Sequence, residues 1–164
     1  QNRWKSDLHL APTQQLYFTT LDYGKLQPLF STKPERCLSS ICPDEHILLV
    51  TGIASPVSLI ETLKEYTPHV CSIAFPDHHA FTPLDLRQVQ QVFGNLPEGK
   101  RLIVTTEKDA ARLMGCEQIS KVLAPCIYVL PITVSFLRNE QEQFNQNIIE
   151  YVRENQRNSS FHQS

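Results

Sequence analysis

The stretch "HILLVTGIASPVSLIETLKEY", residues 46–66, decides the fold because its hydrophobic period changes halfway along. Residues 47–50 form a short aliphatic run of the kind found in a buried β-strand. Ser55 is predicted to cap a following helix, with Pro56 at the first helical position. Helical spacing gives that helix one apolar face, made of Leu59, Leu63 and Tyr66. The stretch therefore predicts a strand followed by an amphipathic helix, which is one βα unit.

Two similar units follow along the chain. Residues 70–75 predict a second strand, and Thr82 with Asp85 predicts a capping box at the start of the next helix. The inward face of that helix is predicted to consist of Leu86, Val89, Phe93 and Leu96. Residues 102–105 predict a third strand, and Thr106 is expected to cap the helix that comes after it.

A fourth unit is predicted over residues 127–155, with Asn139 and Glu142 as its capping box. The helix of this unit would have one apolar face, made of Phe144, Ile148, Tyr151 and Val152. Strands that alternate with helices in this way favour a parallel sheet. We therefore predict an α/β fold of the Rossmann-like type, with an open, mainly parallel sheet of about four βα units.

The first 45 residues do not follow this alternation. The stretch "QQLYFTTLDYGKLQPLF", residues 14–30, predicts two extended runs around a turn at residues 22–24, which would form an appended β-hairpin. The predicted organisation is an extended linker region over residues 1–45, an α/β domain over residues 46–155 and a frayed polar tail over residues 156–164.

The composition argues against several classes of protein. A net charge of −2 with interspersed signs leaves no basic stripe, so nucleic acid is not an expected partner. Five cysteines without a C-x-x-C pair indicate neither a disulfide framework nor a zinc ribbon, and they fit a reducing cytoplasm. No apolar run approaches the roughly 20 residues that span a bilayer, and the first residues lack the apolar centre of a signal peptide. We expect a soluble chain that, without an initiator Met, is a piece of a longer protein.

Polar side chains follow each predicted strand. Strand-to-helix loops of an open parallel sheet emerge at its carboxyl edge, where ligands bind beside helix N-termini. Four segments would meet there: residues 51–56, 76–81, 105–109 and the turn at 135–139. The polar residues expected to face one crevice are Thr51, Asp77, His78, His79, Glu107, Lys108 and Asp109.

Each of these loops also has a purely structural interpretation. Thr106 and Asp109 alone suffice to start a helix, because their side chains accept hydrogen bonds from free backbone N–H groups. Gly52 could serve only a tight turn. The acid followed by two histidines at residues 77–79 is harder to explain in this way. An Asp beside a His can fix its tautomer, and a His can move protons near neutral pH, so we expect a function for at least one of these histidines.

The sequence "GNLPEGKR", residues 94–101, satisfies G-x-x-x-x-G-K but is not predicted to bind phosphate. Arg101 stands where a phosphate-binding loop needs Ser or Thr for magnesium. The segment also follows a predicted helix and precedes a strand, which reverses the order that a phosphate cradle requires. With five glycines in the chain, no other nucleotide cradle is predicted.

Three motifs together resemble a known family. "LLVTGIASP" (48–56), "FPDHHAFT" (75–82) and "IVTTEKDAARL" (103–113), in this order, resemble the C-terminal half of the tetraacyldisaccharide 4′-kinase family of lipid A synthesis. The resemblance covers roughly residues 9–154, including "LYFTTLDYGKLQPL" at 16–29. It implies a P-loop-kinase-associated C-terminal domain of an enzyme that transfers the γ-phosphate of ATP to the 4′-hydroxyl of a tetraacyl glucosamine disaccharide 1-phosphate.

The resemblance also implies partners. An N-terminal P-loop domain, absent from this sequence, would bind ATP and Mg²⁺ and supply a catalytic Asp, so the chain alone is expected to be inactive and to hold no metal of its own. The substrate would be the tetraacyl disaccharide lipid. The full-length enzyme would sit peripherally at the cytoplasmic face of the bacterial inner membrane.

Residue by residue, the family's D-H-H motif places its functional histidine on His78, beside Asp77, and these two are the expected catalytic residues. In the family that histidine is thought to pair with the catalytic Asp of the other domain. His79 is expected to be secondary. The T-E-K-D motif falls on residues 106–109, near nucleotide or the domain interface, and Thr51 and Gly52 would help to shape the crevice.

Two other functions stay open at the level of sequence. Asp-His-His also labels a family of manganese phosphodiesterases, which would make this a metal-dependent phosphoesterase. Those enzymes need further Asp clusters upstream, and the first 70 residues contain no D-x-D after a strand. A non-catalytic regulatory module on an α/β scaffold is the third interpretation.

Overall fold

The structure is a computed structural model that describes residues 7–116 and 119–160. The chain divides into two compact units. One consists of residues 23–132, and the other combines the residues before 23 with those after 132. The described part leaves out residues 1–6, 117–118 and 161–164. The start of the predicted linker region and the end of the predicted tail therefore lie outside it.

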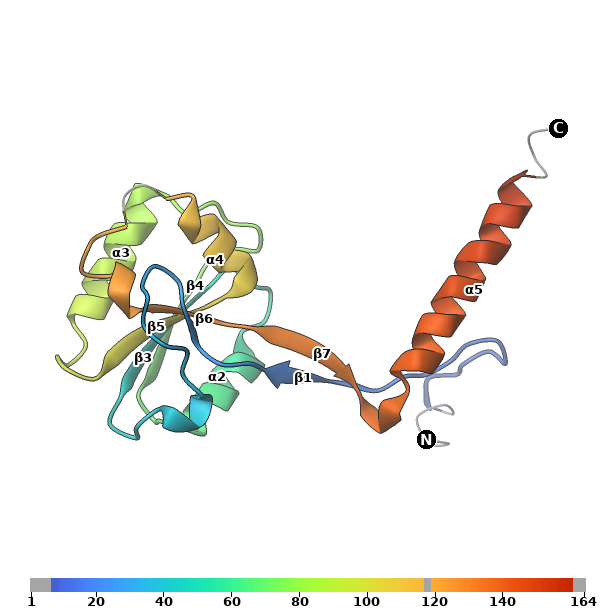
Figure 1. Ribbon diagram of the computed structural model, residues 1–164, viewed down its shortest axis with the longest axis horizontal. Coiled ribbons are helices and arrows are strands. Elements are labelled where there is room, and N and C mark those ends of the chain that lie inside the picture. The colour runs from blue at the N-terminus through green and yellow to red at the C-terminus, as the bar shows by residue number, and fades with distance from the viewer. Residues whose placement is uncertain (1–6, 117–118, 161–164) are drawn as a thin grey trace. The chain divides into compact units, whose positions relative to one another are not determined.

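The larger unit is built on a five-stranded sheet with the order β2-β6-β5-β3-β4 (Figure 1). Four of its strands are parallel, as predicted from the alternating pattern. They are β3 (His46–Thr51), β4 (Val70–Ala74), β5 (Arg101–Thr106) and β6 (Ile127–Leu130). The short β2 (Gln27–Pro28) pairs antiparallel with β6 at one edge.

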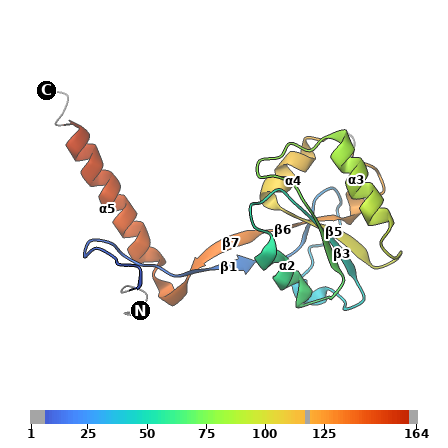
Figure 2. The ribbon, with the colours of Figure 1, turned by 180° about the vertical axis from the view of Figure 1, so that it is seen from behind.

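Helices cover both faces of this sheet (Figures 1 and 2). Helix α2 (Val57–Lys64) lies on one face, while α3 (Pro83–Gly94) and α4 (Glu107–Met114) lie on the other. Alternate residues of β3 divide between the two cores: Ile47 and Leu49 pack with the α2 side chains, and Leu48 and Val50 pack with those of α3. Burial on both faces explains why this strand is apolar throughout rather than alternating.

The capping signals of α3 and α4 are confirmed. The Thr82 hydroxyl accepts from the Asp85 backbone N–H, and the Asp85 carboxylate accepts from that of Thr82. Thr106 likewise accepts from the Asp109 N–H at the start of α4. The predicted inward face of α3 is buried at Leu86, Val89 and Phe93, with Leu96 half-buried beyond the helix end.

The predicted start of α2 is wrong by one residue. Pro56, not Ser55, is the N-cap, and it has no capping side chain. The Pro56 carbonyl accepts the first helical hydrogen bond from the Ile60 N–H at 2.9 Å. Of the predicted apolar stripe, Leu59 and Leu63 are buried, whereas Tyr66 lies beyond the last helical residue.

Residues 94–101, which match the G-x-x-x-x-G-K pattern of a phosphate-binding loop, form a helix-to-strand connection, as predicted. Gly94 ends α3 and Arg101 begins β5. The Arg101 guanidinium turns back onto the helix end, where Nη1 donates to the carbonyls of Phe93 at 3.0 Å and Leu96 at 2.8 Å. It therefore caps the C-terminal end of α3.

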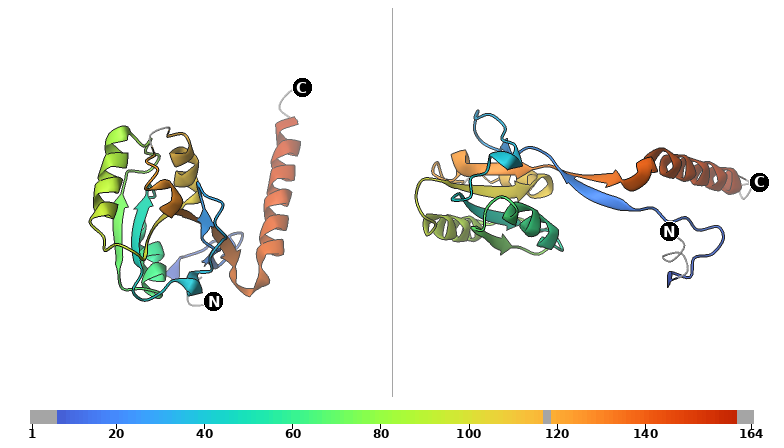
Figure 3. Two further views of the ribbon diagram at one scale, coloured as in Figure 1. Left: turned by 60° about the vertical axis from the view of Figure 1, so that its left-hand side comes forward. Right: turned by 90° about the horizontal axis from the view of Figure 1, so that it is seen from below.

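The second compact unit contains α5 (Gln141–Ser160) and all but one residue each of β1 (Thr19–Tyr23) and β7 (Ile132–Phe136) (Figure 3). Strands β1 and β7 form a separate two-stranded sheet. The predicted hairpin is therefore wrong, since β1 pairs with β7 and β2 pairs with β6. Residues 22 and 23 belong to β1 instead of forming a turn. Both pairings join residues about a hundred positions apart, which a local sequence pattern does not encode.

The fourth βα unit is also wrong. β6 lies in the large sheet, but Pro131 follows it, and β7 and α5 belong to the other unit. Asn139 is not the helix cap, because its φ of 57° is left-handed and the first helical hydrogen bond runs from Phe144 N–H to the Glu140 carbonyl. Helix α5 continues to Ser160, so residues 156–160 are not frayed as predicted.

The apolar face of α5 is only partly covered within its own unit. Phe144 packs against Tyr17 and Phe136, with ring centroids 5.3 and 4.9 Å apart. Further along the helix the side chains of the predicted stripe are exposed, at Ile148, Tyr151 and Val152.

A buried ion pair fixes the segment before β3. Both Arg36 Nη atoms donate to the Glu45 carboxylate, at 2.8 and 2.9 Å, and the Cys42 N–H donates to the same group at 3.2 Å. Glu45 is only 6% exposed. The hydrogen bond from Arg36 holds the pKa of Glu45 below its usual value, although burial opposes this shift.

This pair predicts a pH-dependent stability. Since the folded-state pKa of Glu45 is depressed, its contribution is complete above the ordinary value of about 4.3 and is lost as pH falls through the folded value. Glu45→Gln should lower the free energy of unfolding by about 2 kcal/mol at pH 7 and by less in acid, as measured by urea unfolding of the chain. The control Asp44→Asn, which breaks an exposed pair with Lys100, should leave stability essentially unchanged. Equal pH profiles for Glu45→Gln and the parent chain would contradict the prediction.

Candidate active site at the carboxyl edge of the sheet

Three of the four predicted loops meet at the carboxyl edge of the large sheet. They follow β3, β4 and β5, which are neighbours in the order β5-β3-β4. The fourth, at residues 135–139, follows β7, which is not a strand of the large sheet, so it is not one of the strand-to-helix loops of this sheet as predicted. The helices after β3 and β5 leave toward opposite faces, which makes the gap between these two strands the switch point where α/β proteins commonly bind ligands.

The carboxylate of Asp109 fills this switch point. Asp109 is fully buried, and its Oδ2 accepts from the Gly52 backbone N–H at 2.9 Å and from the Thr106 hydroxyl at 2.8 Å. Its Oδ1 accepts from Arg112 Nη1 at 3.1 Å. Asp109 therefore joins the loop after β3 to the start of α4, and it presents no free oxygen to a ligand.

This close approach favours glycine at position 52. A Cβ at this position would lie 3.1 Å from Asp109 Oδ1 and 3.1 Å from the Pro76 carbonyl oxygen. The structural alternative raised from the sequence, a tight turn, does not involve a positive φ at Gly52. Thr51 before it is completely buried at the end of β3, so its hydroxyl is not exposed at the edge.

His78 stands at the open rim of the edge. Its side chain is 76% exposed, and its backbone has a φ of 61°, which is uncommon for a residue with a Cβ. The Asp77 carboxylate accepts from the His78 backbone N–H at 2.9 Å. On the ring, Nδ1 lies 3.3 Å from Nη2 of Arg112. The imidazole is thus oriented by one arginine and remains open to a group from outside.

Asp77 binds Lys108 and also lies close to the imidazole of His78. Lys108 Nζ donates to Asp77 Oδ1, and this hydrogen bond lowers the pKa of the carboxyl below its usual value. The His78 Nε2 lies 3.5 Å from Asp77 Oδ2, which is longer than a normal N–H···O hydrogen bond. Asp77 therefore shapes the turn and pairs with Lys108, and its expected role in orienting the histidine stays a prediction.

His79 faces the interior and has different partners. Its Nε2 lies 2.8 Å from Asp85 Oδ2, and its ring stacks on Phe75 with centroids 4.8 Å apart. Burial acts to raise the pKa of Asp85, but hydrogen bonds from His79 and Thr82 outweigh it and the pKa lies below its usual value. His79 thus braces the capping box of α3, and only His78 of the two adjacent histidines is exposed.

A hollow of about 380 Å³ opens beside His78. The polar side chains of His78 and Arg112 form part of its wall. The rest of the wall consists of small or apolar residues: Ala80, Phe81, Ala111, Gly115 and Cys116.

Glu107, at the start of α4, is exposed and accepts a hydrogen bond from the Ile132 N–H at 3.3 Å. Arg112 is the residue that sequence reasoning missed, and the only available signal was its position three residues after Asp109 on the same helix.

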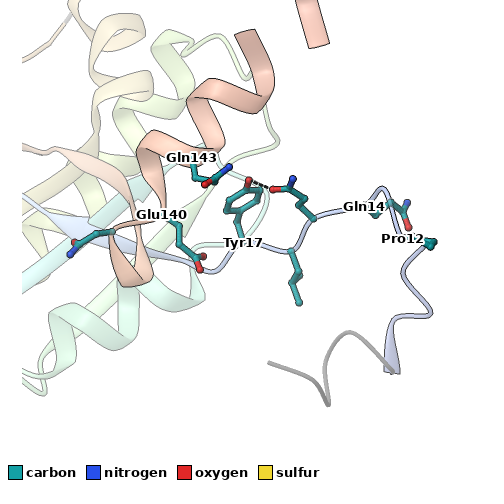
Figure 4. Close-up of a pocket in the computed structure, with 8 residues that line it drawn as sticks. Pro12, Gln14, Tyr17, Glu140 and Gln143 are labelled. Atoms are coloured by element: carbon teal, nitrogen blue, oxygen red, sulfur yellow. Dashed lines mark hydrogen bonds between the residues drawn. The ribbon is translucent and has the colours of Figure 1, made fainter. Parts of the chain in front are cut away.

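A second hollow, of about 520 Å³, lies within the other unit (Figure 4). Its wall comes from residues 12–17 and from the turn into α5, where Glu140 and Gln143 contribute side chains. Tyr17 donates a hydrogen bond to Gln15 Oε1 at 2.5 Å.

Within residues 7–116 and 119–160, no group of three or more His, Cys, Asp or Glu side chains could hold a metal ion. Over the same residues, no helix is both long and apolar enough to cross a membrane.

Comparisons with known proteins give consistent matches. A family model described as Tetraacyldisaccharide-1-P 4′-kinase matches residues 7–153. The chain is 54% identical over 154 residues to a tetraacyldisaccharide 4′-kinase of Phocaeicola vulgatus and 51% identical over 162 residues to one of Bacteroides thetaiotaomicron. Each alignment covers 94% of this chain and 42% of the relative. A crystal structure of LpxK from Aquifex aeolicus in complex with ATP matches 80% of this chain and 35% of that chain, at 17% identity and a TM-score of 0.44.

Proposed function

This chain belongs to the tetraacyldisaccharide-1-P 4′-kinase family, and on that premise we propose that it is the C-terminal part of a lipid A disaccharide 4′-kinase. The complete enzyme would transfer the γ-phosphate of ATP to the 4′-hydroxyl of a tetraacyl disaccharide 1-phosphate. The observation that supports this most strongly is the 54% identity that extends over 94% of the chain. The chain spans about 42% of the length of that relative, so the activity belongs to a longer protein.

The carboxyl edge of the sheet is the proposed contribution of this chain to the active site. His78 would present its open imidazole to the catalytic carboxylate of a P-loop domain that precedes this chain. Phosphoryl transfer depends on positioning and charge neutralisation, and a hydrogen bond from an imidazole orients the carboxylate that receives the hydroxyl proton. Asp77 and Lys108 would hold the turn that carries His78, and residues 106–109 would form the wall next to nucleotide or the domain interface.

Binding of ATP and Mg²⁺ is assigned to the preceding domain. Asp109 is already satisfied by three donors, and Asp77 is paired with Lys108, so neither carboxylate is offered to a metal within this chain. The exposed apolar residues of α5 would pack against the same preceding domain, which accounts for their exposure here. We place the complete enzyme peripherally at the cytoplasmic face of the inner membrane, where its lipid substrate is found.

A transfer assay tests this function. The full-length protein should move the γ-phosphate of radiolabelled ATP to tetraacyl disaccharide 1-phosphate in the presence of Mg²⁺, with the new phosphate located on the 4′-oxygen by phosphorus NMR. The 164-residue chain alone should transfer none and should bind ATP no more tightly than about 1 mM, as measured by calorimetry. Absence of transfer by the full-length protein, or tight Mg²⁺-dependent ATP binding by the chain alone, would contradict the proposal.

A further inference from the structure

We propose that Arg112 is a positioning residue that fixes the tautomer of His78, so that the neutral ring presents Nε2–H at the open rim. The inference rests on the proposed function for its consequence in catalysis, but the tautomer itself is a property of this chain. It assigns a role to a residue outside the two histidines and the acid that the sequence singled out.

The chemistry of the guanidinium sets the direction of the contact. Arginine has five N–H donors and no acceptor, and it stays charged at all relevant pH values. The atom that faces Arg112 Nη2, at 3.3 Å, is Nδ1 of His78. Nδ1 must therefore offer its lone pair, and in the neutral ring the single proton then lies on Nε2.

Arg112 is itself held in place from the core. Its Nη1 donates to the fully buried Asp109 at 3.1 Å, and its side chain is only 23% exposed. Asp109 is in turn fixed by the Gly52 N–H and the Thr106 hydroxyl. A continuous series of hydrogen bonds thus runs from the ends of β3 and β5, through one carboxylate and one guanidinium, to the exposed ring.

The neighbouring Asp77 does not replace Arg112, because its carboxylate faces the other nitrogen of the ring. Asp77 binds Lys108 and the His78 backbone N–H, and its Oδ2 lies 3.5 Å from Nε2, where it favours the same tautomer without a short hydrogen bond. A side chain that is 76% exposed keeps considerable rotamer freedom unless a contact restrains it. Without Arg112, the ring would sample both tautomers and several orientations.

The fixed tautomer decides which partner His78 can serve. An outward Nε2–H donates, so its partner must be an acceptor such as a carboxylate or a phosphate oxygen. The opposite tautomer would turn a lone pair outward, which repels such an oxygen. Arg112 therefore prepares the ring, before the domains meet, for hydrogen bonding to an anion.

Kinetics of the full-length enzyme test whether Arg112 acts through His78. Arg112→Met should lower kcat roughly tenfold with unchanged KM for ATP and lipid, and Arg112→Lys should restore part of the loss. In the His78→Ala background, Arg112→Met should have no further effect, because the two side chains act as one unit. Arg87→Met, which removes an exposed arginine from α3, is the control and should match the parent enzyme. Losses that multiply in the double variant would overturn the proposal, since Arg112 would then act independently of His78.

Nitrogen NMR of the ring provides a readout that needs no activity. In full-length protein labelled with ¹⁵N-histidine, with His78→Ala used to assign the signal, the parent should show a protonated Nε2 and a bare Nδ1. Arg112→Met should shift this signal toward a mixture of tautomers, and Arg112→Lys, which keeps a donor near Nδ1, should shift it less. A parent ring protonated at Nδ1, or one unaffected by either substitution, would overturn the inference. A parent enzyme with this tautomer but without lipid kinase activity would instead refute the proposed function.

Discussion

Replacing His78 with alanine in the full-length enzyme is expected to lower kcat by roughly 100-fold, with little change in the free energy of unfolding. The loss follows from its place at the rim, because a positioned imidazole that assists proton transfer typically contributes a factor of about 10²–10⁴. Stability should be almost unaffected, since the side chain is 76% exposed and buries little surface. Steady-state kinetics with tetraacyl disaccharide 1-phosphate and urea unfolding measure the two effects on the same preparation.

His79→Ala is the matched control, because it removes the same ring one position along the chain. His79 stacks on Phe75 and hydrogen-bonds to Asp85, so its loss should lower the free energy of unfolding by about 1 kcal/mol. Its kcat should stay within about threefold of the parent value, because the ring faces the interior. If His79→Ala abolished transfer while His78→Ala remained active, the assignment of the two histidines would be reversed.

The largest loss of stability is expected for Asp109→Asn, at about 3 kcal/mol. The amide nearly preserves the shape of the side chain but removes the charge that balances Arg112. It also directs a new N–H₂ group toward a site where three donors already converge: the Gly52 N–H, the Thr106 hydroxyl and the Arg112 guanidinium. Since Asp109 is fully buried, water cannot hydrogen-bond to the donors that would lose their acceptor in this variant.

Urea unfolding of the parent chain and the Asp109→Asn variant measures this loss. Asp77→Asn is the appropriate control, because it neutralises an acid in the same site that is exposed and whose ion pair with Lys108 is also exposed. That control should leave the unfolding midpoint unchanged, as exposed ion pairs contribute little. If the two variants had equal stability, Asp109 would not link β3 and α4 as the hydrogen bonds indicate.

Local signals in the sequence predicted most of the larger unit. The aliphatic runs of β3 and β5 are buried on both faces, and this makes them recognisable without knowledge of their neighbours. The caps at Thr82 and Thr106 were equally predictable, because a helix cap involves groups only three residues apart. The shift of the α2 start to Pro56 shows the usual limit of such signals at helix boundaries.

The failures occurred where distant segments meet. The partner of β1 is β7, and the partner of β2 is β6, so neighbouring runs of the N-terminal region take part in different sheets. The helical period of α5 was visible, but the period does not say which surface covers an apolar face. Ile148, Tyr151 and Val152 on that face are exposed in this chain. Helix α5 belongs to the smaller unit and not to the unit that contains the large sheet.

The sequence by itself determined three βα units, the three loops that follow β3, β4 and β5, and the family, because these depend on residue types and spacings within single segments. Only the tertiary structure decided which of two adjacent histidines is open, since His78 and His79 differ in their contacts with Arg112 and Asp85 and not in their chemistry. It also decided that Asp109 fills the switch point. Hydrogen bonds between residues tens of positions apart exist only after the chain has folded, so the arrangement of this site is a property of the fold.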